Sequence, residues 1–209
     1  GPHGCCILSQ EFYETRDDHD FVRGYTMQIL RGAPPIETAI SGYFMRQLSI
    51  GKRHHEQFDK LFNHTAGIAI IAEDLPELHN QVELDYDNKD LFGMPGVKVH
   101  YKLSDNTKKI LKHGIKMSKE IFSEVDAKVT SSFAPVKNTG WHLMGTARMG
   151  TDPQASVVNK YGQAHQVKNL FIVDSSVFVT SGAANPVATA QAITLFACNY
   201  IRDNIANII

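Results

Sequence analysis

The sequence predicts an α+β fold: a mainly antiparallel sheet with helices on one face, followed by the strand and helix of a second, layered α/β unit. Three observations lead to this prediction. The first 130 residues contain short strand-like segments separated by loop-like ones, and a charged amphipathic helix follows these strands. Near the end, a wholly apolar run precedes a helix that is apolar nearly all round.

Four segments have the composition of strands. Residues 21–30 alternate so that Tyr25 and Met27 share one face, as in a half-buried strand. The segments between the four are mostly loop-like and do not suit the repeated crossovers of a parallel sheet, so antiparallel pairing is expected. The other three segments are 67–72, 81–86 and 97–103.

Two helices are expected in the same part of the chain. Residues 52–62 are polar with a few apolar side chains at helical spacing, which predicts a short helix. Residues 104–125 form a charged helix with an apolar stripe, and Ser104 or Asp105 is the expected N-cap. The sequence Arg-Gly-Ala-Pro-Pro at 31–35 is expected to end the first strand.

The tail has a different character. Residues 169–174 read Asn-Leu-Phe-Ile-Val-Asp, which predicts a short strand buried on both faces. Residues 186–200 form an all-round apolar helix, and such helices belong in the middle of a large body. The chain offers little to surround them, so we expect the tail to complete a layered domain whose remainder is absent. The expected division is 1–130 and 131–209.

Composition limits the functional classes. The chain has 209 residues, 43% of them hydrophobic, and a formal net charge of −1, which argues against nucleic-acid binding and against a basic membrane-binding patch. Its apolar stretches are too short to span a bilayer and its start does not resemble a signal peptide, so we expect a soluble protein without direct membrane insertion. The compartment is not predicted. The three cysteines have no metal-site spacing.

Two motifs in the tail carry the residues best suited to chemistry. Residues 142–150 read His-Leu-Met-Gly-Thr-Ala-Arg-Met-Gly, and residues 181–186 read Ser-Gly-Ala-Ala-Asn-Pro. The imidazole of His142 can accept a proton near neutral pH, and the amide of Asn185 can donate a hydrogen bond beside a helix N-terminus. Simpler roles stay open, because His142 can pack within its loop and Asn185 can cap the helix before Pro186.

These motifs, with Asn-Leu-Phe-Ile-Val-Asp-Ser-Ser-Val-Phe at 169–178, closely resemble the C-terminal region of the glucose–methanol–choline (GMC) oxidoreductases. The closest branch contains bacterial gluconate and sugar dehydrogenases and pyranose oxidases, in which the second active-site position is asparagine. Upstream, residues 71–76 and 97–101 look like the substrate domain of the family.

The resemblance implies that FAD is used to oxidise an alcohol or sugar hydroxyl by hydride transfer to the flavin. It implies that His142 is the base and that Asn185 donates a hydrogen bond to the substrate oxygen. Residues 1–130 then form the substrate domain, and 131–209 complete a Rossmann-like FAD-binding domain. No metal site is expected. The residues implied to lie near FAD are Asp174, Ser175, Asn185, Pro186 and Val187. For Asp174, a plain role as the turn acid that ends a strand stays open.

One family feature is missing. The Gly-x-Gly-x-x-Gly turn that places FAD pyrophosphate at a helix N-terminus does not occur in this sequence. We therefore expect this chain to be the C-terminal part of a flavoenzyme, with the N-terminal FAD-binding half as its missing partner, and to be inactive alone. The other expected partners are a small alcohol or sugar and either a second copy or an electron-acceptor subunit. The alternative is a non-catalytic carbohydrate-binding or subunit-interaction module that keeps the fold without flavin.

Overall fold

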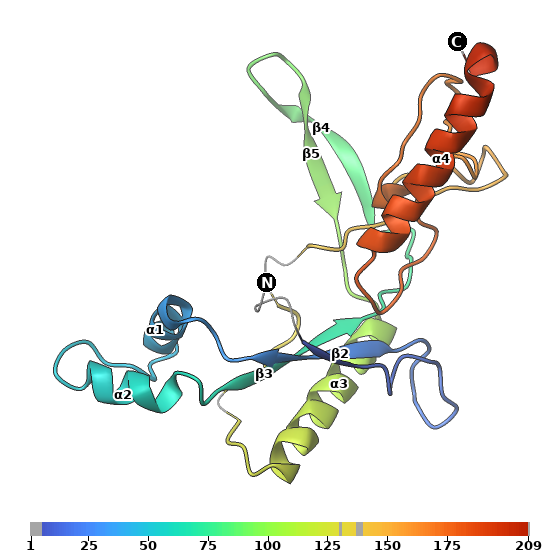
Figure 1. The fold of residues 1–209 in the computed structure, drawn as a ribbon. Coiled ribbons are helices and arrows are strands. Elements are labelled where there is room, and N and C mark those ends of the chain that lie inside the picture. Colours follow the sequence, from blue (N-terminus) through green and yellow to red (C-terminus); the bar gives the residue numbers. More distant parts are fainter. Residues whose placement is uncertain (1–5, 130, 137–139, 209) are drawn as a thin grey trace.

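The computed structural model describes residues 6–129, 131–136 and 140–208 (Figure 1). These residues form a mixed α/β structure with two small antiparallel sheets and four α-helices. The predicted combination of antiparallel strands and helices is therefore confirmed. The division of the chain near residue 130 stays a prediction.

The first sheet has the strand order β1-β2-β3, with both pairs antiparallel. Its strands are β1 (Ile7–Ser9), β2 (Tyr25–Arg31) and β3 (Ala66–Ala72). Tyr25 and Met27 are almost fully buried, as their alternation predicts. Because side chains alternate along a strand, Gln28 of β2 points to the opposite face of the sheet from these two residues.

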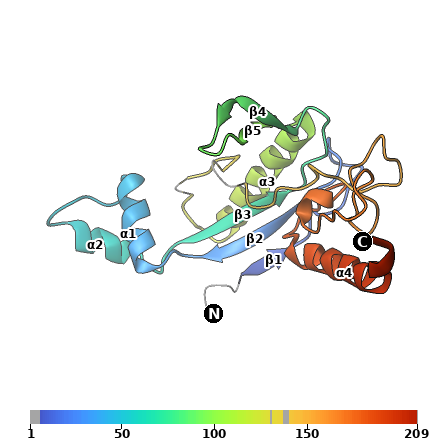
Figure 2. The same cartoon turned by 90° about the horizontal axis from the view of Figure 1, so that it is seen from above.

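Helix α3 (Asp105–Glu124) covers the face of the sheet that holds Tyr25 and Met27 (Figure 2). Its N-cap is Ser104, whose Oγ accepts a hydrogen bond from the backbone N–H of Thr107 at 3.1 Å. Ile110 is fully buried in the same cluster. The predicted helix and its predicted cap are both confirmed.

The remaining two strands form a separate hairpin of β4 (Gln81–Lys89) and β5 (Pro95–His100), which projects away from the first sheet in Figure 1. Asn80 closes its base, since the Asn80 Oδ1 accepts the backbone N–H of Lys102 at 2.7 Å. The prediction that all four segments build one sheet is therefore wrong, although their antiparallel pairing is right. Alternation predicts a strand but does not identify its neighbour.

Helices α1 (Pro35–Phe44) and α2 (His54–Leu61) lie beyond the end of β2 and β3 instead of on a sheet face (Figure 2). The expectation of helices on one face holds for α3 and is wrong for these two. The sequence predicts α2 but not α1, because the two prolines at 34–35 indicate a break in the chain. Proline is favoured at the first helical position, where no backbone N–H is needed, and Pro35 occupies that position.

The tail contains a short 3₁₀ turn, η1 (Ser175–Val177), and helix α4 (Val187–Ile208). The predicted strand at 169–174 is wrong: within the described chain this segment makes a single bridge, from Phe171 to Gln163. Its backbone bonds go to a neighbouring loop, for example from the Ile172 N–H to the Gly162 carbonyl at 2.8 Å. No strand lies alongside it in the described residues, so the Rossmann-like character of the tail stays a prediction. No described helix is long and apolar enough to cross a membrane.

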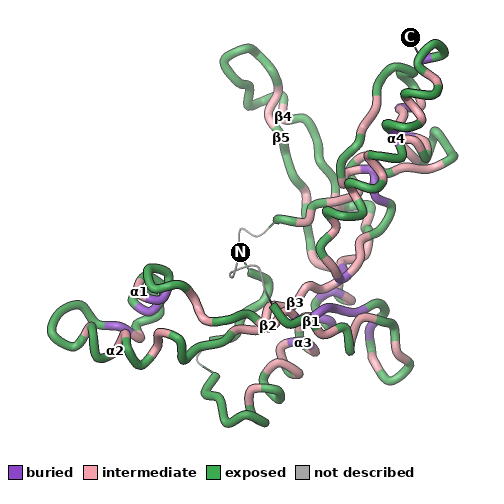
Figure 3. Tube along the Cα trace, in the orientation of Figure 1, coloured by how far each residue is buried: buried purple, intermediate pink, exposed green. Residues whose placement is uncertain are grey.

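Two separate clusters hold most of the buried hydrophobic side chains of the described residues, and the buried stretches are short, as the purple in Figure 3 shows. One lies between the first sheet and α3, and the other lies between α4 and the loops before it. The total accessible surface is 15,205 Å². A compact monomer of 23.3 kDa exposes about 9,700 Å². The chain therefore exposes much surface that a compact protein of its size buries. The second cluster comprises Val158, Ala164, Val177 and Phe178, flanked by Met144, Met149, Ile172, Ala190 and Ile193.

Gly24 allows a close backbone contact that helps place the loop before β2. A Cβ atom at Gly24 would lie 2.0 Å from the carbonyl oxygen of Phe12 and 2.5 Å from that of Tyr13. We expect Gly24→Ala to lower the free energy of unfolding by about 1–3 kcal/mol, because the backbone must move to relieve the overlap. The measurement is denaturant unfolding of the whole protein. Gly67→Ala is the matched control, since its Cβ would meet only Leu30 Cβ at 4.0 Å. Equal unfolding midpoints for the two variants would contradict this prediction.

Candidate active site

His142 and Asn185 lie side by side although they are 43 positions apart in the sequence. The Nε2 atom of His142 is 3.3 Å from the Nδ2 atom of Asn185. His142 is half-buried, whereas Asn185 is exposed. The two residues singled out in the sequence are therefore brought together, and their chemical roles stay predictions.

The loop that carries His142 is fixed by backbone hydrogen bonds to η1. The N–H groups of Ala147 and Met149 donate to the carbonyls of Ser176 and Val177 at 2.9 and 2.8 Å. Gly145 has a positive φ of 84°, and a Cβ there would lie 3.3 Å from the Phe178 carbonyl oxygen. This glycine thus permits the loop to run close to the segment after η1.

The other end of the Asn185 carboxamide contacts the first sheet. Its Oδ1 accepts a hydrogen bond from Gln28 Nε2 at 2.9 Å, across 157 residues of sequence. Gln28, Asn185 and His142 therefore form a chain of three polar side chains that joins β2 to the tail. The Oδ1 atom that would cap α4 is engaged by Gln28, which weakens the interpretation of Asn185 as a plain N-cap.

A second contact joins the tail to the first sheet. The Ser181 hydroxyl donates to the Asp74 carbonyl at 2.9 Å, just beyond the end of β3. The Asp74 carboxylate accepts hydrogen bonds from the Tyr101 hydroxyl at 2.5 Å and the Thr107 hydroxyl at 2.6 Å. Asp74 thus links β3, the hairpin, α3 and the tail at one point.

The neighbouring Glu73 is a buried carboxyl, only 4% exposed. Burial raises its pKa above the usual range, opposed by Arg23, whose Nε lies 3.6 Å from Glu73 Oε1. Nothing in the sequence pattern distinguishes Gln28, Glu73 or Asp74 from other polar residues at the surface of a strand or at its end. Only the fold shows that they meet the tail.

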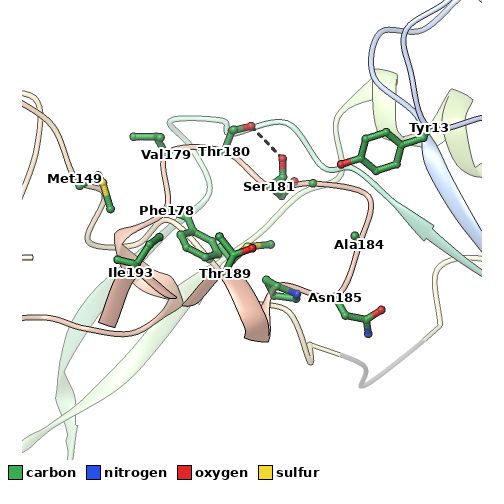
Figure 4. A pocket seen from close by; sticks show the side chains of 13 residues that line it. Tyr13, Met149, Phe178, Val179, Thr180, Ser181, Ala184, Asn185, Thr189 and Ile193 are labelled. Atoms are coloured by element: carbon green, nitrogen blue, oxygen red, sulfur yellow. Dashed lines mark hydrogen bonds between the residues drawn. The ribbon is translucent and has the colours of Figure 1, made fainter. Parts of the chain in front are cut away.

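A cavity of about 300 Å³ opens beside Asn185 at the start of α4 (Figure 4). Phe178 and Ile193 lie at one end of it, and Asn185 lies at the other. Tyr13 also lines it, and a Cβ at Gly182 would come within 3.2 Å of the Tyr13 hydroxyl. The further lining residues are Met144, Met149, Val179, Thr180, Ser181, Ala184, Pro186 and Thr189.

The other predicted site residues are placed differently. Pro186 lines the cavity, but His142, Asp174, Ser175 and Val187 are not among its described lining residues. The Asp174 Oδ1 accepts the backbone N–H of Ser176 at 2.8 Å, and hydrogen bonds from Ser176 lower the pKa of the Asp174 carboxyl. Asp174 therefore has the geometry of a turn acid, which is the simpler of the two roles open to it. In the residues that the structure covers, no group of three or more histidines, cysteines or carboxylates could hold a metal ion.

Comparison with known proteins identifies the chain. A model of the family described as GMC oxidoreductase matches residues 76–194, more than half of the chain. The chain belongs to the GMC oxidoreductase family. The resemblance carried by the His142 and Asn185 motifs is thereby confirmed. The family is FAD-dependent, and FAD binding by this chain stays a proposal.

Individual relatives are dehydrogenases and oxidases. The chain is 35% identical to a 2-methyl-1,2-propanediol dehydrogenase of Mycolicibacterium austroafricanum, over all of this chain and 38% of that protein. It is 28% identical to the fructose dehydrogenase large subunit of Gluconobacter japonicus, over 75% of this chain and 28% of that protein. It is 26% identical to the gluconate 2-dehydrogenase flavoprotein of Pantoea cypripedii, over 59% of this chain and 22% of that protein. The chain thus spans less than two fifths of the length of these relatives.

Proposed function

We propose that this GMC chain forms the substrate-facing part of an FAD-dependent oxidoreductase that oxidises an alcohol or sugar hydroxyl. The observation that carries the proposal is the 3.3 Å approach of His142 Nε2 to Asn185 Nδ2, beside a cavity at the N-terminus of α4. Relatives named for a diol, fructose and gluconate support the substrate class.

In this proposal the substrate hydroxyl lies within reach of both side chains. His142 Nε2 accepts the hydroxyl proton as general base. The Asn185 amide donates a hydrogen bond to the same oxygen and stabilises the negative charge that develops there. FAD, when bound, would supply the acceptor for the hydride that leaves the substrate carbon.

The residues around the cavity fit the ring end of a flavin. Its walls include apolar side chains such as Met144, Phe178 and Ile193, which suit a flat aromatic ring. The N-terminus of α4 carries partial positive charge, which suits the pyrimidine edge that gains electrons. Asn185, Pro186 and Val187 would contact that edge. The pyrophosphate lacks a comparable site, because the sequence has no Gly-x-Gly-x-x-Gly turn.

The test is anaerobic flavin reduction in the whole protein, followed by loss of the yellow absorbance. The panel of substrates contains 1,2-diols, fructose, gluconate and aliphatic alcohols. We expect at least one of them to bleach the flavin. A whole protein that is colourless yet binds sugars would instead support the alternative of a non-catalytic carbohydrate-binding module.

A further inference from the structure

We infer that Gln28 is a positioning residue that fixes which end of the Asn185 carboxamide faces His142. The inference rests on the proposed function and deepens it. It concerns a strand residue in the other part of the chain, which makes no hydrogen bond to His142 in the described structure and is not among the described residues that line the cavity.

The first step is the chemistry of the amide. A carboxamide has a donor end, Nδ2, and an acceptor end, Oδ1, and rotation by 180° exchanges them with little change of shape. Gln28 Nε2 donates to Asn185 Oδ1 at 2.9 Å, so the acceptor end is held on the side of β2. The donor end must then point to the other side, where His142 Nε2 lies 3.3 Å away.

The second step is what this orientation does for the reaction. A histidine that is ready to accept a proton carries a lone pair on Nε2, and a lone pair requires a donor as its neighbour in the resting site. The same donor then faces the alkoxide-like oxygen when substrate is present. The reversed amide would place an acceptor oxygen against both groups and would repel the developing charge.

The third step is the rigidity of the support. Gln28 lies in the middle of β2, the central strand, and is paired with Leu8 of β1 and Ala69 of β3. Its side chain is half-buried on the face of the sheet opposite α3. A donor on a central strand loses less freedom when it binds than one on a loop, so it holds the amide more effectively.

The decisive variant is Gln28→Glu in the whole protein. The carboxylate keeps the size of the side chain but only accepts hydrogen bonds at neutral pH, so it favours the reversed Asn185 amide. Since loss of an oxyanion donor lowers kcat roughly 10²–10³-fold, we expect flavin reduction to slow by about 10- to 100-fold, with KM little changed. Gln154→Glu, at an exposed turn, is the control for the charge change and should leave the rate unchanged.

Two further measurements separate positioning from a structural role. FAD content and melting temperature should stay near the wild-type values in Gln28→Glu. As the pH falls, the introduced carboxyl gains a proton and can donate again. The rate of the variant divided by the wild-type rate should therefore rise toward low pH. A loss caused by a distorted fold would not recover in this way.

A double-mutant cycle tests whether Gln28 acts through Asn185. In an Asn185→Ala background we expect Gln28→Glu to slow flavin reduction no further. An equal slowing in both backgrounds would overturn the inference, because Gln28 would then act on the substrate or on His142 directly. If Gln28→Glu fails to fold, Gln28→Leu takes its place in the cycle with the same expectation of no further slowing.

The cycle also distinguishes the inference from the proposal on which it rests. Wild-type reduction rates in both His142→Ala and Asn185→Ala would overturn the proposed function. A slow Asn185→Ala together with a wild-type rate in Gln28→Glu would overturn only the role of Gln28.

Discussion

Replacing His142 by alanine should slow flavin reduction by roughly 10²- to 10⁴-fold in the whole protein, the usual loss when a general base is removed. FAD should stay bound, because His142 is not among the described residues that line the cavity. The imidazole acts in this account only on the substrate proton. The measurement is the anaerobic rate of flavin bleaching at saturating substrate, followed by stopped-flow absorbance.

A suitable control is His64→Ala. His64 is exposed, and its described side-chain hydrogen bond joins Nδ1 to the nearby Phe62 carbonyl oxygen at 2.9 Å. We expect this variant to reduce its flavin at the wild-type rate. If His142→Ala does the same, the base is another group and the role assigned to His142 is wrong.

The 209-residue chain produced alone should bind FAD far more weakly than the whole protein, turn over no substrate and self-associate. Its accessible surface of 15,205 Å² exceeds that of a compact monomer by about 5,500 Å², an excess comparable to large obligate interfaces. Much of it is apolar: Leu91 and Phe92 at the hairpin tip are 100% and 91% exposed, and Leu195 and Phe196 of α4 are 64% and 51% exposed. Such patches mark interfaces or sites of aggregation.

The measurements are light scattering for the size of the particles and absorbance near the flavin bands after incubation with FAD. The whole protein, purified in parallel, is the control and should be yellow. A chain that is monomeric, yellow and active when made alone would show that the missing pyrophosphate turn is not needed.

The sequence predicted best those features that depend on local patterns. The alternation of Tyr25 and Met27 identified both β2 and its buried face, and Ser104 identified the start of α3. The pairing of His142 with Asn185 was expected only through the family resemblance, because no periodicity relates two residues that lie 43 positions apart.

What could not be predicted depends on distant contacts. Gln28 looks like any polar strand residue until the fold brings it to Asn185. The run at 169–174 has the composition of a buried strand, yet it bonds to a loop because no strand lies beside it in the described residues. Composition reports how apolar a segment is, whereas pairing depends on which partners are present.

The excursion that contains α1 and α2 leaves and re-enters the sheet at paired positions, Arg31 of β2 and Ala66 of β3. Its two ends are therefore held together whatever its length, as in an enlarged hairpin loop. Evolution can lengthen, shorten or exchange residues 32–65 without shifting the register that holds Gln28 opposite Ala69. Protein engineers can exchange it too. Grafting residues 32–65 from a relative would change the periphery of the molecule, while the position of the strand that carries Gln28 would stay unchanged.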